Sequence, residues 1–187
     1  MRPFDTVSLT TARLSLRPLV PSDAEALFAV YSDPQVMRYW STPPWPTIDA
    51  AHELITKDRA AHAAGTYIRL GIALQGTDVV FGTCTLFDFV VQCRRAELGY
   101  AMASKMWGHG YMHEALSALV VFGFDELDLN RIEADIDPRN AASARSLERL
   151  GFVKEGHLRE RWIVDGEVSD SDLYGLLRSD WPATNTR

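Results

Sequence analysis

The feature that most constrains the fold is a crossover near the middle of the chain. Residues 96–103 and the short run 131–137 both have strand-like sequences. Between them a helix pattern begins near Tyr111, and we therefore predict one clear β-α-β unit joining these two segments. The small and apolar residues of this helix fall on one face: Met112, Ala115, Leu116, Leu119, Val120, Gly123 and Leu127.

The segments on either side of the crossover contain the other elements. Strand patterns occupy residues 11–19, 68–75, 79–91, 153–164 and 167–177, with polar turns at 76–78 and 165–166. Helix patterns precede the second strand and follow residue 139. The predicted order is β-α-α-β-β-β-α-β-α-β-β. We expect an α/β (α+β) fold with one mixed central sheet of about seven strands and about four flanking helices, not a doubly wound parallel sheet.

Capping residues suggest where the first two helices begin and end. Ser22 suits the N-cap of the first helix, with Glu25 at the capping-box position and Pro34 as a stop. Thr47 suits the N-cap of the second helix, which runs to about residue 64 and ends at Gly65.

Length and charge exclude some classes of protein. A chain of 187 residues suits one domain, and a formal net charge of −6 disfavours a nucleic-acid partner. The sequence contains no apolar run long enough to span a membrane and does not begin like a signal peptide. We therefore expect a cytoplasmic protein with no membrane partner. Cys84 and Cys93 are expected to be reduced thiols, because two cysteines make neither a disulfide framework nor a zinc site.

The glycine-bearing loop WGHGYM, residues 107–112, is the first candidate for chemistry. Glycines allow a sharp turn, and the helix behind them leaves its first N–H groups unpaired beside the positive end of its dipole. Such a loop can bind a pyrophosphate without lysine or arginine. The alternative is that the loop is only a tight connection between a strand and a helix.

Other readings of this region are less well supported. A P-loop would need Gly-Lys-Ser/Thr, which is absent, and a dinucleotide fingerprint would need a glycine at His113. A nicotinamide-dependent oxidoreductase is nevertheless the rival enzyme class. His109 and His113 could share a helix face as metal ligands, but no third ligand accompanies them. We therefore expect no metal.

A second polar turn follows the strand at residues 131–137. Asn140 suits the N-cap of a helix that ends at Gly151, and capping alone could explain it. Ser143 would face the same way from the first helical turn. Both side chains would then meet the C-terminal end of the strand near the loop 107–112, where ligands of α/β sheets gather.

These segments together resemble a known family. ELGYAM, WGHGYMHEAL and RIEADIDPRNAASARSLERLGF look like the acetyl-CoA-binding core of the GNAT superfamily, and most of all like its ribosomal-protein N-terminal acetyltransferase (Rim-type) branch. The resemblance extends over nearly the whole chain. It implies a single GNAT-like domain over residues 1–187, with an acetyl-CoA core at about 95–152. It also implies one-step acetyl transfer from acetyl-CoA to an amine.

The resemblance assigns roles by position. The loop would bind the pyrophosphate through its backbone amides, the edge of the preceding strand would pair with the pantetheine arm, and the helix start would hold that arm and the thioester sulfur. Two loop positions depart from the superfamily pattern, which has Gln or Arg where Trp107 stands and a small residue where Met112 stands. The implied cofactor-binding residues are Tyr100, Ala101, Met102, Trp107, Gly108, His109, Gly110, Tyr111, Met112, Asn140 and Ser143.

Two side chains are candidates for catalysis. An α-amine with a pKa of about 7.7–8.0 is roughly 10–20% neutral at pH 7, against about 0.04% for a lysine. An α-amine therefore needs only a weak base, such as a carboxylate acting through water. Glu97 is the candidate base, although it could instead be a surface or salt-bridged residue beside Arg94 and Arg95. Ser143 is the candidate acid at the leaving thiolate.

The acceptor amine is expected to bind at the irregular segment 36–47. Tyr39, Trp40 and Trp45 lie there among prolines, and such aromatics either pack on the domain or line a pocket. The resemblance favours the N-terminal amine of a protein, such as a ribosomal protein. The alternatives are a small-molecule amine (a polyamine, drug or metabolite) and a non-catalytic CoA-binding domain. A homodimer is a further expectation from this branch.

Overall fold

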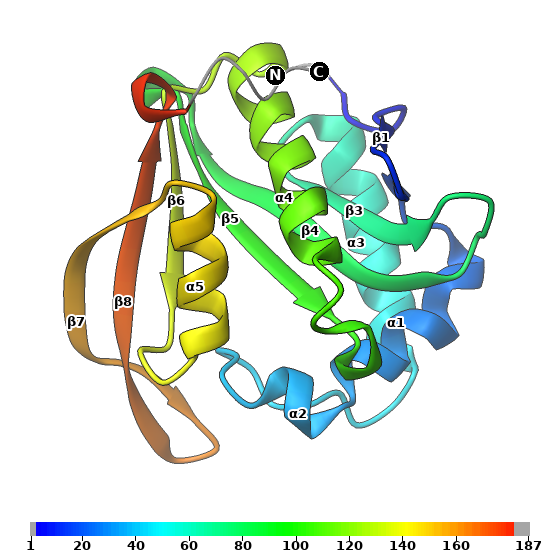
Figure 1. Cartoon of the computed structure of the whole chain (residues 1–187). Helices are drawn as coiled ribbons and strands as arrows, with labels where there is room; N and C mark the ends of the chain where they lie inside the picture. The colour runs from blue at the N-terminus through cyan, green and yellow to red at the C-terminus, as the bar shows by residue number, and fades with distance from the viewer. Residues whose placement is uncertain (1–2, 182–187) are drawn as a thin grey trace.

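The computed structural model describes residues 3–181 and contains one mixed sheet of eight strands in the order β1-β2-β3-β4-β5-β6-β8-β7. The chain alternates between this sheet and the helices that pack on it (Figure 1). The strands are β1 (Leu9–Thr10), β2 (Leu14–Pro18), β3 (Ile68–Leu74), β4 (Val80–Val90), β5 (Arg95–Met102), β6 (Arg131–Ile136), β7 (Val153–Val164) and β8 (Glu167–Leu177). The α-helices are α1 (Ala24–Tyr31), α2 (Pro34–Met37), α3 (Asp49–Ala64), α4 (Tyr111–Val121) and α5 (Ala141–Arg149).

The predicted crossover is present between β5 and β6. These strands are parallel, and all the other neighbouring pairs in the sheet are antiparallel. They pair only at their beginnings, from Arg95 opposite Arg131 to Glu97 opposite Glu133. Beyond that point β5 continues along β4 while β6 continues along β8, so the two strands separate (Figure 1). The C-terminal half of β5 therefore has a free edge on its β6 side.

Helices cover both faces of the sheet. Helices α4 and α5 pack on one face, and α1 and α3 pack on the other face over the first half of the sheet (Figure 1). Side chains along β5 point alternately to the two faces of the sheet, so this strand contributes to the core on each face. Ala96, Leu98 and Met102 belong to the core under α4, whereas Ala101 belongs to the core under α1. The end of β5 thus lies between two cores, which fixes its position.

Some predicted helix starts are wrong. The chain forms a 3-10 turn at Pro21–Asp23, and Asp23, not Ser22, occupies the N-cap of α1. The carboxylate of Asp23 binds Arg17 at 2.8 Å and the backbone N–H of Val20 at 2.8 Å, so it holds the strand-to-helix turn. No side chain caps α1, and the capping box with Glu25 does not form.

The second helix also begins differently. Ile48, not Thr47, occupies the N-cap of α3, and the Thr47 hydroxyl lies 3.3 Å from the Asp49 carboxylate instead. The helix ends as predicted at Gly65, which has a φ of 67°. The short β1 and α2 were not predicted. Helix α1 stops before Pro34, as expected, but Pro34 then begins α2, where its fixed φ suits the first helical position.

Within residues 3–181 no helix is both long and apolar enough to cross a lipid bilayer.

Candidate functional site

A cavity of about 640 Å³ opens where β5 and β6 separate. Its walls come from the end of β5, the loop that follows it, the first turn of α4, the exposed side of α5 and residues 35–40. Most of the predicted site residues line it: Tyr39, Trp40, Tyr100, Ala101, Met102, Trp107, Gly108, Gly110, Tyr111, Met112, Asn140 and Ser143. Segments more than a hundred residues apart in the sequence therefore meet at one site.

Three of the predicted residues do not line this cavity: Glu97, His109 and Trp45. The His109 ring stacks on Tyr111, with ring centroids 5.4 Å apart, and its Nδ1 lies 2.9 Å from the carbonyl oxygen of Trp107. These contacts hold the exposed His109 ring against the loop.

The loop before α4 has the geometry of an anion site. Gly108 and Gly110 have φ values of 80° and 77°, which other residues rarely adopt. The Glu114 N–H donates to the Gly110 carbonyl at 3.1 Å, so the three amides before Glu114 have no preceding helical carbonyl. The Trp107 indole donates to the Met102 carbonyl at 2.9 Å and ties the loop to the end of β5. The residues that carry these amides, Tyr111, Met112 and His113, line the same cavity as the end of β5.

Sequence reasoning missed the residues that brace this loop. Arg13 donates to the Glu114 carboxylate at 2.6 Å and to the His109 carbonyl at 3.0 Å, and its guanidinium lies 4.6 Å from the Tyr111 ring centroid. The Thr11 hydroxyl donates to the same carboxylate at 2.5 Å. These contacts hold the pKa of Glu114 below its usual range, although burial alone would raise it. Arg13 and Glu114 are 101 positions apart, and no local pattern signals the pair.

The start of α5 presents a hydroxyl pair to the cavity. The Asn140 side-chain oxygen accepts the Ser143 N–H at 3.1 Å, which confirms Asn140 as the N-cap. The Ser143 hydroxyl, nearly buried, lies 2.6 Å from the Tyr100 hydroxyl. Burial raises the pKa of Tyr100 to about 12, so the phenol is protonated at neutral pH. The cavity thus contains a tyrosine–serine pair at the point where β5 meets α5.

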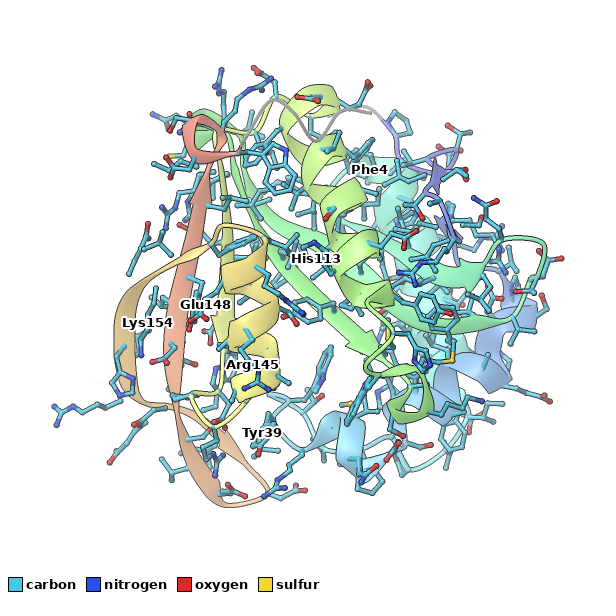
Figure 2. The ribbon with its side chains drawn as sticks, in the orientation of Figure 1. Phe4, Tyr39, His113, Arg145, Glu148 and Lys154 are labelled. Carbon is cyan, nitrogen blue, oxygen red and sulfur yellow. The ribbon has the colours of Figure 1, made fainter. Side chains whose placement is uncertain are left out.

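The lining of the large cavity is basic in an otherwise acidic protein. Arg38, His113, Arg145 and Arg149 line it, and no aspartate or glutamate does. Figure 2 shows Arg145 on α5, with Tyr39 on the neighbouring segment. Within residues 3–181 the three arginines have no carboxylate partner, whereas most other arginines do. Burial and the charge of Arg149 lower the pKa of His113. Such a lining suits a polyanion.

Glu97 lies on the other face of β5 from Tyr100, as their odd spacing in a strand requires. It makes no ion pair within residues 3–181, since Arg95 binds Glu133 instead. Burial, followed by the charges of Asp88, Asp135 and Glu133, raises the pKa of Glu97. The residue is thus a partly buried carboxylate that binds a proton more readily than usual.

The aromatic residues of segment 36–47 divide between core and cavity. The Trp45 ring stacks on the Tyr31 ring with centroids 4.5 Å apart, and the backbone N–H of Trp45 donates to the backbone carbonyl of Tyr31 at 2.9 Å. Trp40 meets Tyr31 edge-on at 5.3 Å while also lining the cavity. Tyr31 is buried, and its hydroxyl lies 2.7 Å from that of Thr83 on β4. Tyr31 therefore anchors the segment, so that Tyr39 and Trp40 reach the cavity.

A second cavity of about 240 Å³ adjoins the first. Both are lined by Arg38, Tyr39 and Trp40, so these residues form the junction between the two. The remaining walls of the small cavity come from prolines of segment 34–44, the turn after β6 and the β7–β8 turn. They include three carboxylates and one further arginine: Asp137, Asp165, Glu167 and Arg139.

The described part of the chain contains no group of three or more histidine, cysteine, aspartate or glutamate side chains that could hold a metal ion.

Comparison with known proteins agrees with this geometry. The family model for the acetyltransferase (GNAT) domain matches residues 13–153. An uncharacterised N-acetyltransferase, p20 of Bacillus licheniformis, is 35% identical over 93% of this chain and 98% of its own length. The [ribosomal protein uS5]-alanine N-acetyltransferase of Escherichia coli is 31% identical over 94% of this chain and 93% of its own length.

A solved structure provides a third comparison. RimJ of Mycobacterium smegmatis, in complex with CoA-disulfide, superimposes with a TM-score of 0.89 at 25% identity, covering 99% of this chain and 94% of that one. The family match, the shared topology and the relatives at this level of identity lead to one conclusion. This chain belongs to the GNAT acetyltransferase family and is an N-acetyltransferase.

Proposed function

We propose that this N-acetyltransferase takes its acetyl group from acetyl-CoA and transfers it to the N-terminal amine of a protein, such as a ribosomal protein. A small-molecule amine is the alternative acceptor. One observation supports acetyl-CoA as the donor: the cavity lining contains no aspartate or glutamate and includes the start of α4, arginines without a carboxylate partner within residues 3–181, and the free edge of β5. The cavity of about 640 Å³ is of the size that drug-sized ligands and cofactors occupy.

The residues that line the cavity fit the phosphates and the pantetheine arm of acetyl-CoA. The amides of loop 107–112 and the first turn of α4 would hold the pyrophosphate. The free edge at Tyr100, Ala101 and Met102 would pair with the amide groups of the pantetheine arm. The Asn140 side-chain oxygen caps α5, which leaves its NH₂ group to bind that arm. Arg145 and Arg149 line the cavity without carboxylate partners and would bind the remaining phosphate charge.

Two side chains would assist the transfer. Acetyl-CoA supplies the acetyl group as a thioester and leaves as the CoA thiol. Glu97 would accept the proton of the acceptor amine through water, since it lies outside the cavity lining. Its raised pKa supports this role, because a base works best when its pKa is near the working pH. The Ser143 hydroxyl would hydrogen-bond the sulfur, with Tyr100 fixing its orientation.

The acceptor would approach along Tyr39 and Trp40, where the two cavities meet, while Trp45 supports them from the core. An α-amine is favoured because a substantial fraction is already neutral at pH 7, which suits a base that acts only through water. A cytoplasmic location remains a prediction from the sequence, and a homodimer remains a prediction from the resemblance.

Mass spectrometry of acetylated products would test this function. The protein is incubated with acetyl-CoA and a panel of peptides with free N-termini, the same peptides with blocked N-termini but a free lysine, polyamines and aminoglycosides. We expect a mass increase of one acetyl group on free N-termini only. Acetylation confined to polyamines or aminoglycosides would replace the protein acceptor with the alternative. No product with any amine, despite acetyl-CoA binding, would contradict the proposal.

A further inference from the structure

The junction between the two cavities carries a positive charge that nothing in the described chain neutralises. Arg38 lines both cavities, and its guanidinium lies 5.2 Å from the centroid of the Tyr39 ring, which holds it in place. It has no carboxylate partner within residues 3–181. An arginine that is stacked but unpaired keeps its donors available for a ligand.

The other arginine of the small cavity already has two carboxylate partners. Arg139 lies 5.8 Å from the centroid of the same Tyr39 ring. It binds Asp137 at 2.6 Å and Glu167 at 2.5 Å, so those two carboxylates of the small cavity are also occupied. Asp165 is the only carboxylate of the small cavity without an ion pair in the described chain, and the large cavity has none. The lining of the small cavity as a whole carries three carboxylates and two arginines, but the path into the large cavity passes Arg38, which is the only charged residue shared by the two linings.

This charge pattern bears on the acceptor. A polyamine carries several positive charges and would meet the guanidinium of Arg38 at the junction, where no carboxylate lines both cavities. A peptide reaching into the large cavity with its N-terminal amine would pass Arg38 with its next residues, since an extended chain advances about 3.3–3.6 Å per residue. We infer that Arg38 is a specificity-determining residue that selects acceptor peptides with an acidic side chain within the first few positions.

The inference rests on the proposed function, and it predicts how kcat/KM depends on the charge of the acceptor peptide. Glutamate at the second or third position should raise kcat/KM about fivefold over glutamine, which is the upper end for an ion pair in contact with solvent. Lysine at the same position should lower kcat/KM. The effect should appear in the acceptor KM, because Arg38 lies on the approach path and not at the tyrosine–serine pair.

Charge reversal tests this expectation. Peptides that differ only in glutamate, glutamine or lysine at positions two and three are compared with the wild type, Arg38→Gln and Arg38→Glu. Arg38→Gln should abolish the preference and Arg38→Glu should reverse it, with the KM for acetyl-CoA unchanged. Arg59→Glu is the matched control, since Arg59 is an exposed arginine of α3 outside both cavities, and it should keep the wild-type preference.

The outcomes separate this inference from the proposed function. If the wild type acetylates all the peptides equally well, the selectivity of Arg38 is refuted while the protein acceptor stands. A preference that survives in Arg38→Glu would also refute it. If both Arg38 variants raise the KM for acetyl-CoA equally with every peptide, Arg38 binds the cofactor and not the acceptor. If the wild type acetylates no peptide but does acetylate a polyamine, both proposals fail.

Discussion

The hydrogen bond between Tyr100 and Ser143 can be isolated by removing a single oxygen atom. Tyr100→Phe keeps the ring in the core and deletes only the hydroxyl that lies 2.6 Å from the Ser143 hydroxyl. Tyr100 is the only side-chain partner of that hydroxyl in the described chain. With a pKa of about 12, Tyr100 is protonated and can donate to Ser143. The Ser143 proton is then free to point at the sulfur.

The size of the effect follows from the kind of bond. A hydrogen bond between neutral groups contributes about 0.5–1.5 kcal/mol. If that energy orients Ser143 in the transition state, losing it lowers kcat about two- to thirteenfold. Ser143→Ala removes the donor itself and should lower kcat about ten- to a hundredfold, with little change in CoA binding. Tyr100→Phe should add nothing further in the Ser143→Ala background, because its effect passes through the serine.

The assay measures free CoA thiol at saturating acetyl-CoA and acceptor. An aromatic disulfide reagent reports the thiol by its colour, but Cys93 is exposed and would react as well. Cys93→Ser is therefore the background for all four proteins of the cycle. Cys84 is buried, and burial raises the pKa of its thiol, so it stays unreactive in the folded protein.

Two results would refute this reasoning. If Tyr100→Phe lowers kcat by the same factor with and without Ser143, the two residues act independently. If Tyr100→Phe leaves kcat unchanged while Ser143→Ala reduces it, the serine needs no orientation. A change in the CoA dissociation constant as large as the change in kcat would instead indicate a displaced β5.

Three further predictions follow from contacts and backbone angles. Glu97→Gln should remove the acidic limb of the kcat/KM–pH profile. The pKa of Glu97 is raised in the folded protein, so this carboxyl stabilises the fold at low pH and this stabilisation is lost as pH rises through its folded pKa. Glu97→Gln should therefore also raise Tm at pH 7 but not near about pH 4. Gly110 and Gly76 have φ of 77° and 76°, so Gly110→Ala and its control Gly76→Ala should each lower the free energy of unfolding by about 1–2 kcal/mol in denaturant titration. Only Gly110→Ala should raise the KM for acetyl-CoA. Equal KM values for the two variants would exclude the loop from acetyl-CoA binding. Tyr31→Phe should lower the free energy of unfolding in urea by about 1–3 kcal/mol, because it leaves the buried Thr83 hydroxyl unpaired. Adding Thr83→Val should restore most of that stability. If the losses of the two single variants simply add in the double variant, this reasoning is wrong.

The sequence predicted those parts of the site that depend on local pattern. The strand–loop–helix at residues 95–121 and the capped helix after residue 139 have their own capping, glycine and periodicity signals, and these elements form as expected. The strand period could also have placed Glu97 and Tyr100 on opposite faces, since they are three positions apart.

Other features depend on contacts that no local pattern encodes. Ser22 and Asp23 are both residue types that favour an N-cap, but the Asp23 carboxylate binds Arg17 from the preceding strand and does not cap α1. Trp45 turns to the core while Tyr39 lines the cavity, because Tyr31 offers a buried ring to only part of the segment. The tyrosine–serine pair joins residues 43 positions apart. Such pairings exist only once the sheet has formed.

The separation of β5 from β6 leaves a gap in the middle of the sheet, with a free strand edge along the end of β5. Along residues 99–102 alternate N–H groups point to β4, and the others have no β6 partner across the gap, so these should exchange quickly with deuterated solvent until a ligand occupies it. If the pantetheine arm pairs there, acetyl-CoA acts as a removable strand as well as a reactant. Binding at about a hundred times the dissociation constant would add about 2.7 kcal/mol to the free energy of unfolding. The lifetime of this protein against proteases should therefore follow the supply of its co-substrate.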